Sequence, residues 1–164
     1  MNDAALVHPK ILHGQALLEC LSTLRRTGKR LVFANGCYDI LHPGHMDLLS
    51  RAKLLGDTLL LALNDDASVR RLGKGPDRPV NPLAVRMYMA AQLSCVDLVT
   101  FFREDTPLEC IQLVRPQVLV KGGDWPLEKI VGREIVEAAG GSVCSLPLLP
   151  GYSTTELIER IRRL

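Results

Sequence analysis

The chain has 164 residues, of which 47% are hydrophobic and 23% charged, and its formal net charge is +2. This length fits one domain with a core of its own, and the composition is ordinary for a soluble globular protein. The small net charge and the scattered basic residues argue against nonspecific nucleic-acid binding, and no apolar run reaches the about 18 residues that a membrane span needs.

The five cysteines are an odd number without CxxC spacing, which favours reduced thiols in a cytoplasmic protein over a disulfide scaffold or a zinc site. Residues 1–13 lack the charged and apolar regions of a signal peptide. We therefore predict a flexible N-terminal lead over residues 1–14, followed by a single domain over residues 15–164.

Segments with helical spacing of apolar residues alternate with short apolar runs along the chain. The helical pattern covers Gln15–Arg26, Gly44–Leu55, Pro82–Cys95, Pro107–Val114, Leu127–Ala139 and Ser153–Arg162. The apolar runs predict strands at Leu31–Ala34, Thr58–Leu63, Asp97–Phe102, Val118–Lys121 and Ser142–Leu146. Residues 64–81 are polar and are predicted to form a short helical turn and a surface loop. This order predicts an α/β protein, a Rossmann-like three-layer α/β/α fold with a five-stranded parallel sheet.

Three polar segments follow strands directly, at residues 35–45, 64–78 and 121–125, and should meet at one edge of the sheet. Parallel sheets bind ligands at the carboxyl ends of their strands, near the point where the strand order reverses. The first segment leads from a buried strand through Asn35-Gly36 to a helix start, which presents backbone N–H groups to an anion. We therefore predict that residues 31–45 hold the phosphates of a nucleotide.

His42 and His45 stand three positions apart at the start of a predicted helix, so both can face the same side. Together with the helix N-terminus they would stabilise a phosphate whose negative charge grows during a reaction. A side chain at Gly44 would crowd that phosphate, which explains a glycine there. By spacing alone, a capping histidine beside an unrelated one explains the pair equally well.

A second candidate anion site lies near the C-terminus, where Ser153, Thr154 and Thr155 open the last predicted helix. Hydroxyl groups and unpaired N–H groups at a helix N-terminus bind phosphate. Read alone, Ser-Thr-Thr-Glu is more often a capping box that only stabilises the helix. Two complementary anion sites in one small α/β domain favour the functional interpretation.

Residues 38–45 fit the pattern Phe/Tyr-Asp-x-x-His-x-Gly-His and resemble the HxGH nucleotidyltransferase superfamily, and residues 151–155 resemble its G-x-S-T-T motif. Longer segments resemble the adenylyltransferases of the ADP-heptose pathway: Asn35–His42, Arg78–Leu83, Arg86-Met87, Asp105–Pro107 and Val120–Trp125. The resemblance covers about residues 15–164. In many bacteria this enzyme is the C-terminal half of a bifunctional sugar kinase/adenylyltransferase, and here we expect the stand-alone form, because the chain leaves no room for a kinase half.

The resemblance implies the HxGH nucleotidyltransferase fold and transfer of AMP from ATP to D-glycero-β-D-manno-heptose 1-phosphate, giving ADP-heptose and pyrophosphate for the lipopolysaccharide inner core. Mg²⁺ would accompany ATP without a dedicated protein site. The implied catalytic residues are His42, His45 and Lys74, and the implied substrate-binding residues are Asp39 and Lys121. The implied nucleotide-binding residues are Asn35, Gly36, Cys37, Tyr38, Gly44, Arg86, Gly122, Asp124, Trp125, Ser153, Thr154 and Thr155. Exposed apolar helix faces and family habit favour a homodimer.

Several of these side chains have structural interpretations that the sequence leaves open. The alternative interpretation of Lys74 is a solvated loop lysine, and Arg86 either contacts a phosphate or pairs with an acid. Trp125 reads also as a packing residue, and Asp39 as a turn-forming aspartate. Arg78 is a weaker candidate than Arg86 for a phosphate contact.

One departure from related enzymes separates subgroups. The cytidylyltransferases for glycerol 3-phosphate and choline phosphate carry Arg-Thr where this chain has Leu148-Leu149, so part of their phosphate clamp is missing. A cytidylyltransferase for a phosphorylated alcohol, an adenylyltransferase for another acceptor such as phosphopantetheine, and a non-catalytic nucleotide-binding module stay open. A dinucleotide-binding oxidoreductase ranks below them, because G-x-G-x-x-G is missing after the first strand.

Overall fold

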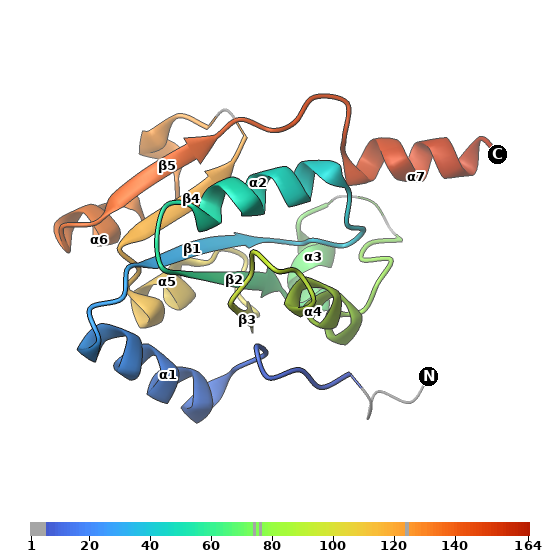
Figure 1. Cartoon of the computed structure of the whole chain (residues 1–164). Coiled ribbons are helices and arrows are strands. Elements are labelled where there is room, and N and C mark those ends of the chain that lie inside the picture. The colour runs from blue at the N-terminus through green and yellow to red at the C-terminus, as the bar shows by residue number, and fades with distance from the viewer. Residues whose placement is uncertain (1–5, 74, 76, 124) are drawn as a thin grey trace.

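Five parallel strands form one sheet in the order β3-β2-β1-β4-β5 (Figure 1). The computed structural model describes residues 6–73, 75, 77–123 and 125–164. The strands are β1 Leu31–Gly36, β2 Thr58–Asn64, β3 Leu98–Phe102, β4 Val118–Gly122 and β5 Ser142–Leu146. The helices are α1 Gly14–Arg26, α2 Pro43–Lys53, α3 Asp66–Arg71, α4 Leu83–Ala91, α5 Leu108–Val114, the 3-10 helix η2 Leu127–Lys129, α6 Arg133–Ala138 and α7 Thr154–Arg162. The predicted α/β class and five-stranded parallel sheet are confirmed.

Helices cover both faces of the sheet, so the central strands read as continuous apolar runs. Every residue of β2 is buried. Val32 and Ala34 of β1 pack with residues of α2 and α4, whereas Leu31 and Phe33 pack with residues of α1, α5 and α6. Figure 1 shows α2 on one side of the sheet and α1 and α5 on the other. Successive side chains of a strand therefore enter two separate cores.

The helix predicted over Leu127–Ala139 is broken in the structure into η2 and α6. The break falls at Gly132, whose φ of +87° is outside the helical region and which forms the N-cap of α6. A Cβ at this position would lie 2.6 Å from Cδ1 of Ile111. The prediction of one continuous helix was therefore wrong, because it was based on the spacing of apolar residues, which carries no information on the backbone conformation of Gly132.

Within the predicted N-terminal lead over residues 1–14, residues 10–12 lie against the edge strand β3. Leu12 N donates to Val99 O at 2.9 Å, Val99 N donates to Lys10 O at 2.8 Å, and Lys10 Nζ donates to Leu93 O at 2.9 Å. Residues 1–5 lie outside the described residues. An edge strand offers unsatisfied backbone groups, and here the N-terminal segment satisfies part of them.

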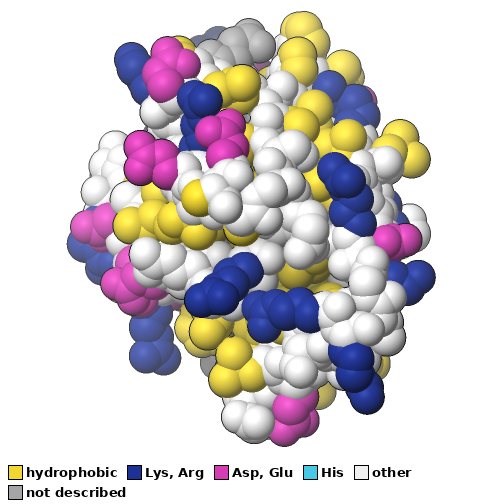
Figure 2. Space-filling view, turned by 90° about the vertical axis from the view of Figure 1, so that its left-hand side faces the viewer, with side chains coloured by type: hydrophobic (Ala, Val, Ile, Leu, Met, Phe, Trp, Pro, Cys, Tyr) yellow, Lys and Arg dark blue, Asp and Glu magenta, His cyan; other side chains and the backbone are white. Residues whose placement is uncertain are grey.

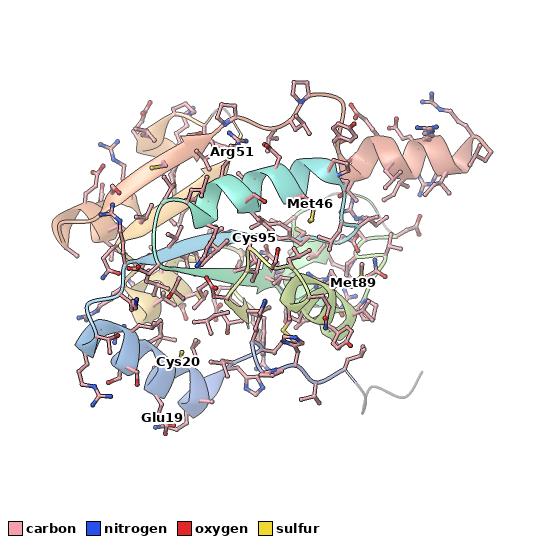
Figure 3. All side chains as sticks on the ribbon, in the orientation of Figure 1. Glu19, Cys20, Met46, Arg51, Met89 and Cys95 are labelled. Atoms are coloured by element: carbon pink, nitrogen blue, oxygen red, sulfur yellow. The ribbon has the colours of Figure 1, made fainter. Side chains whose placement is uncertain are left out.

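The helix α7 extends past the carboxyl edge of the sheet (Figure 1), and none of its residues is buried. Its first turn is tied to the loop after β1, because Thr154 Oγ1 donates to Ile40 O at 3.4 Å. The segment before it is tied to α2, where Arg51 donates to Pro147 O; Figure 3 shows Arg51 between α2 and β5. The Thr154 contact places the C-terminal motif beside the loop that leads into the N-terminus of α2, and the Arg51 contact fixes the preceding segment along that helix.

The opposite edge of the molecule carries interspersed basic, acidic and hydrophobic side chains, and no histidine is visible among them (Figure 2). The histidine motif lies instead at the carboxyl ends of the strands, as predicted for a parallel sheet. In the part of the chain that the structure describes, no helix combines the length and the apolar character needed to cross a membrane.

Candidate functional site

A cavity of about 430 Å³ opens between the carboxyl edge of the sheet and the N-termini of α2 and α7, a size usual for small-molecule sites. The predicted site residues that line it are Asn35, Gly36, Cys37, Tyr38, Asp39, His42, Gly44, His45, Lys121, Gly122, Ser153, Thr154 and Thr155. Leu48, Arg78, Leu148 and Tyr152 complete the lining. The fold therefore brings both predicted anion motifs, more than 100 positions apart in the chain, to one cavity.

The rings of His42 and His45 stack at the N-terminus of α2, with centroids 3.7 Å apart and 23° between the planes. His42 is the N-cap, and Pro43 starts the helix. Nδ1 of His42 is buried and has no hydrogen-bond partner among the described residues. Burial lowers the pKa of His42, so the protein alone favours its neutral form. An anion in the cavity would give Nδ1 of His42 a hydrogen-bond partner, and its negative charge would favour the doubly protonated, cationic imidazole.

Tyr38 closes the inner side of this histidine pair, with its ring centroid 4.7 Å from that of His45. Burial, and then the neighbouring Cys95 and Cys37 thiols, raise the pKa of the Tyr38 hydroxyl, which therefore stays protonated. The backbone of Tyr38 has a φ of +46°, which is uncommon for a residue with a side chain and marks a tightly determined turn.

Gly44 lies between the histidines where any side chain would narrow the cavity. A Cβ there would lie 3.1 Å from Cε1 and Nδ1 of His42 and 3.4 Å from Cβ of Tyr152. This contact supports the reason given for Gly44 from the sequence, since the space beside the His42 ring is kept open. Tyr152 was not singled out from the sequence, because nothing in its local pattern marks it as a cavity residue.

Ser153 and Thr154 both have structural partners at the start of α7. Ser153 Oγ accepts from Glu156 N at 3.1 Å, which is the N-cap bond expected of a capping box. Thr154 Oγ1 donates to Ile40 O. The capping interpretation and the anion-binding interpretation therefore coexist, because the capped helix still turns its N-terminus and Thr155 toward the cavity.

Asp39 is buried and fixes the segment 78–81 against the turn after β1. Its carboxylate accepts from Arg78 Nε at 2.5 Å, from Val80 N at 2.9 Å and from Asn81 N at 2.8 Å. Asn81 Nδ2 donates to Asp39 O at 2.6 Å. Asp39 thus organises its surroundings, and Arg78, only 7% exposed, lines the cavity beside it. The sequence does not show this placement of Arg78, because only the fold brings Asp39 beside it.

Arg86, predicted to bind nucleotide, lies behind the lining of the cavity. Its side chain is completely buried and donates to Asn81 O at 3.0 Å, to Cys37 O at 2.7 Å and to Asp66 Oδ1 at 2.7 Å. The alternative interpretation, pairing with an acid, describes this geometry. These contacts give Arg86 a positioning role for the turn at Cys37, and a direct phosphate contact stays a prediction.

The end of β4 and the loop after it divide between two cavities. Gly122, the last residue of β4, lines the main one, and a Cβ on it would lie 2.6 Å from Cδ2 of Leu48, so a side chain there would displace the Leu48 side chain of α2. Trp125 lines a separate small cavity, and Lys121 lines both. The predicted residues Asp124 and Lys74 lie outside the described residues.

The charged lining favours an anion over a metal ion. Asp39 is the one carboxylate among the described lining residues, and its oxygens already accept three hydrogen bonds. No cluster of three or more His, Cys, Asp or Glu side chains suited to a metal occurs within the described ranges. Arg78 and Lys121 bring cationic side chains to the cavity, and the charge of Arg78 is partly balanced by Asp39.

Comparison with known proteins gives a consistent picture. The sequence pattern of the cytidylyltransferase-like family matches residues 33–160. The chain is 56% identical over 146 residues to the bifunctional protein HldE of Halorhodospira halophila, covering 89% of this chain and 30% of that protein. It is 51% identical over 152 residues to the bifunctional protein HldE of Syntrophotalea carbinolica, covering 93% of this chain and 31% of that protein. The chain thus spans about a third of the length of these relatives.

Two solved structures share the fold. A lipopolysaccharide core biosynthesis protein from Thermoplasma volcanium has a TM-score of 0.60 and 27% identity, covering 74% of this chain and 98% of that one. A pantoate-beta-alanine ligase from Francisella tularensis, complexed with beta-gamma ATP and beta-alanine, has a TM-score of 0.52 and 14% identity. The match covers 94% of this chain and 78% of that one. The second likeness concerns the fold alone.

Proposed function

This chain belongs to the cytidylyltransferase-like family, and from that membership we propose that it is a nucleotidyltransferase that moves AMP from ATP to D-glycero-β-D-manno-heptose 1-phosphate. The products are ADP-heptose and pyrophosphate. The observation that carries the proposal is the convergence of the stacked His42 and His45 with residues 153–155 in one cavity. Two facing helix N-termini, two imidazoles and two cationic side chains suit a triphosphate.

The reaction needs no covalent enzyme intermediate. An oxygen of the sugar phosphate forms a bond to the α-phosphorus of ATP while the bond from that phosphorus to the bridging oxygen of the β-phosphate breaks. The attacking and leaving oxygens lie in line, so catalysis consists of positioning and neutralisation of charge. His42 and His45 contact the α- and β-phosphates and stabilise the charge that grows there.

The remaining contacts follow from the two ends of the cavity. Ser153, Thr154 and Thr155 hold the β- and γ-phosphates at the N-terminus of α7, and Lys74, which lies outside the described residues, is assigned the role of a cationic partner of the triphosphate. Mg²⁺ would accompany ATP and neutralise charge on its phosphates; Asp39, the carboxylate of the described lining, is already engaged by Arg78 and is not expected to hold it.

The choice of ATP and of a sugar phosphate is supported by three independent features. Leu148 lines the cavity at the position where the cytidylyltransferases for glycerol 3-phosphate and choline phosphate carry arginine. The identity of about one half to the bifunctional proteins agrees with the resemblance to the ADP-heptose adenylyltransferases. The named role of the Thermoplasma volcanium protein in lipopolysaccharide core biosynthesis agrees with a heptose acceptor.

A substrate panel tests the proposal directly. Each of ATP, CTP, GTP and UTP is combined with heptose 1-phosphate, glycerol 3-phosphate and phosphopantetheine, and pyrophosphate release is measured. We expect turnover with ATP and heptose 1-phosphate together and none with either alone. Faster turnover of CTP with glycerol 3-phosphate would assign the chain to the cytidylyltransferases, and no turnover in any combination would favour a non-catalytic nucleotide-binding module.

The histidine pair provides the mechanistic test. The double variant His42→Asn/His45→Asn should stay folded and lose about 10²-fold or more in turnover, because each donor to a developing charge contributes that much. His13→Asn is the matched control, since this histidine lies at the N-cap of α1, outside the cavity lining. Unchanged turnover in the double variant would refute the mechanism.

We further propose a cytoplasmic homodimer. None of the five cysteines forms a disulfide, and all five are described, which agrees with a reducing compartment. Ile161 and Leu164 near the C-terminus are more than half exposed and offer an apolar surface to a second copy. Light scattering at several protein concentrations measures the oligomeric state.

A further inference from the structure

A second cavity, of about 120 Å³, opens at the same edge of the sheet but on the face covered by α5 and α6. It is lined by Asn35, Lys121, Trp125, Ile130 and neighbouring residues. Asn35 and Lys121 line the main cavity as well. The two cavities therefore share lining residues at the carboxyl ends of β1 and β4.

Strand alternation explains why these two side chains lean toward the second cavity. In β1, Leu31 and Phe33 pack on the α5/α6 face, and Asn35 continues their side. In β4, Leu119 packs on that same face and Lys121 continues its side. The histidines start α2, which covers the opposite face. The edge of the sheet thus separates the histidine side from the Asn35/Lys121 side.

In-line transfer requires the attacking oxygen and the leaving pyrophosphate on opposite sides of the α-phosphorus. The proposed function puts the pyrophosphate between the N-termini of α2 and α7, so the attacking sugar phosphate must arrive from the other side. The second cavity lies on that side and shares Asn35 and Lys121 with the lining of the main cavity. The strand order reverses at this point, between β1 and β4, where parallel sheets commonly bind ligands.

We propose that this second cavity is the sugar subsite and that Trp125 determines specificity for the sugar acceptor; the inference rests on the proposed function. It assigns to the acceptor a side chain that the sequence had assigned to the nucleotide. The phosphate of the acceptor lies toward Lys121, which lines both cavities, and the ring of the sugar lies against Trp125.

The chemistry of the lining suits a sugar ring. A pyranose has C–H groups on its faces and hydroxyl groups at its rim, so it needs an aromatic or apolar platform with a few polar groups beside it. The Trp125 ring is 49% exposed and supplies the platform, and the amide of Asn35 can both donate to and accept from hydroxyl groups. Lys121 Nζ lies over the Trp125 ring, 5.7 Å from its centroid, so the ammonium that would bind the phosphate of the acceptor stands directly beside the platform.

The position of the platform is built into the backbone. Trp125 N donates to Ser145 Oγ at 3.1 Å, and Ser145 Oγ donates in turn to Gly123 O. Gly123 has a φ of +110°, and a Cβ on it would lie 3.0 Å from Cδ1 and Nε1 of Trp125. A side chain at Gly123 would therefore push the indole out of its place.

Two aromatic variants separate the subsites. Trp125→Ala should raise the KM for heptose 1-phosphate by about tenfold or more and leave the KM for ATP within about twofold. Tyr152→Ala should raise the KM for ATP and leave the KM for heptose 1-phosphate nearly unchanged, because Tyr152 lines the main cavity and not the second one. Trp125→Phe keeps a platform and should restore most of the loss. A rise in the KM for ATP alone, or no rise in either KM, in Trp125→Ala would overturn the proposal.

Trp125 is the single tryptophan of the chain, so its fluorescence reports on this cavity directly. Heptose 1-phosphate, added with Mg²⁺ and an ATP analogue whose α–β bridge cannot be cleaved, should change the emission of the wild-type protein saturably. If the enzyme turns over heptose 1-phosphate but the emission does not respond, the sugar subsite is refuted and the function stands. If heptose 1-phosphate supports no pyrophosphate release, the function fails and this inference falls with it.

Discussion

The contacts of Arg86 allow a prediction that separates a structural arginine from one that binds nucleotide. Its guanidinium donates to two backbone carbonyls, of Asn81 and Cys37, and to Asp66, whose side chain is 30% exposed. In Arg86→Met the methionine keeps most of the buried volume, but the two carbonyls lose their donor. The buried Cys37 carbonyl left unsatisfied costs about 1–3 kcal/mol and the partly buried Asn81 carbonyl less, so we expect the free energy of unfolding to fall by about 2–4 kcal/mol.

The loss is measured by urea and thermal unfolding. A domain of this size loses about 2–4 °C in Tm for each kcal/mol, so the midpoint should fall by roughly 10 °C. The KM for ATP, measured at a temperature where the variant is folded, should change little. Arg71→Met is the matched control, because Arg71 pairs with Asp105 at 2.5 Å with both side chains exposed (48% and 69%), and such a pair contributes about 1 kcal/mol at most. Wild-type stability combined with a large loss of ATP affinity in Arg86→Met would refute the reasoning.

Three further predictions concern single positions. Gly44→Ala should keep or raise the free energy of unfolding, since alanine favours a helix over glycine by about 1 kcal/mol. It should slow turnover by about tenfold or more, because its Cβ would crowd the His42 ring. Turnover at the wild-type rate would contradict this prediction. Burial lowers the pKa of His42, so the unfolded chain binds a proton first as the pH falls below about 6.5. The free energy of unfolding should therefore decrease below this pH, and it should decrease less in His42→Gln. If urea unfolding gave the same dependence of this free energy on pH for both proteins, the prediction would be excluded. Gly132→Ala should lower Tm more than Gly140→Ala, because both have positive φ but only the first Cβ meets a neighbour, Ile111, at 2.6 Å; equal losses would show that the clash is relieved.

The fold class could be predicted, and the two candidate anion motifs could be recognised, because both depend on local properties of the chain. Apolar runs that are buried on both faces have to be strands of a covered parallel sheet, and such a sheet gathers its loops at one edge. The segment with His42 and His45, and the segment with Ser153–Thr155, each carry their chemistry within a few residues. Their meeting in one cavity follows from the parallel topology.

The sequence failed where a distant contact decides the outcome. Periodicity predicted one helix over residues 127–139, but the packing of Gly132 on Ile111 selects a backbone that breaks it. Composition did not indicate that residues 10–12 of the predicted lead lie against the open edge of β3. In both cases the deciding partner comes from another element.

For the site, the sequence determined which kinds of residues carry the chemistry, and only the tertiary structure decided what each one faces. Arg78 and Arg86 look alike in the sequence, but Asp39 holds the first at the cavity while three acceptors bury the second behind it. Trp125 and Gly122 are near neighbours in the chain but border different cavities. The physical reason is that the strand pleat and the long-range hydrogen bonds set the direction of a side chain, and neither is encoded within a local motif.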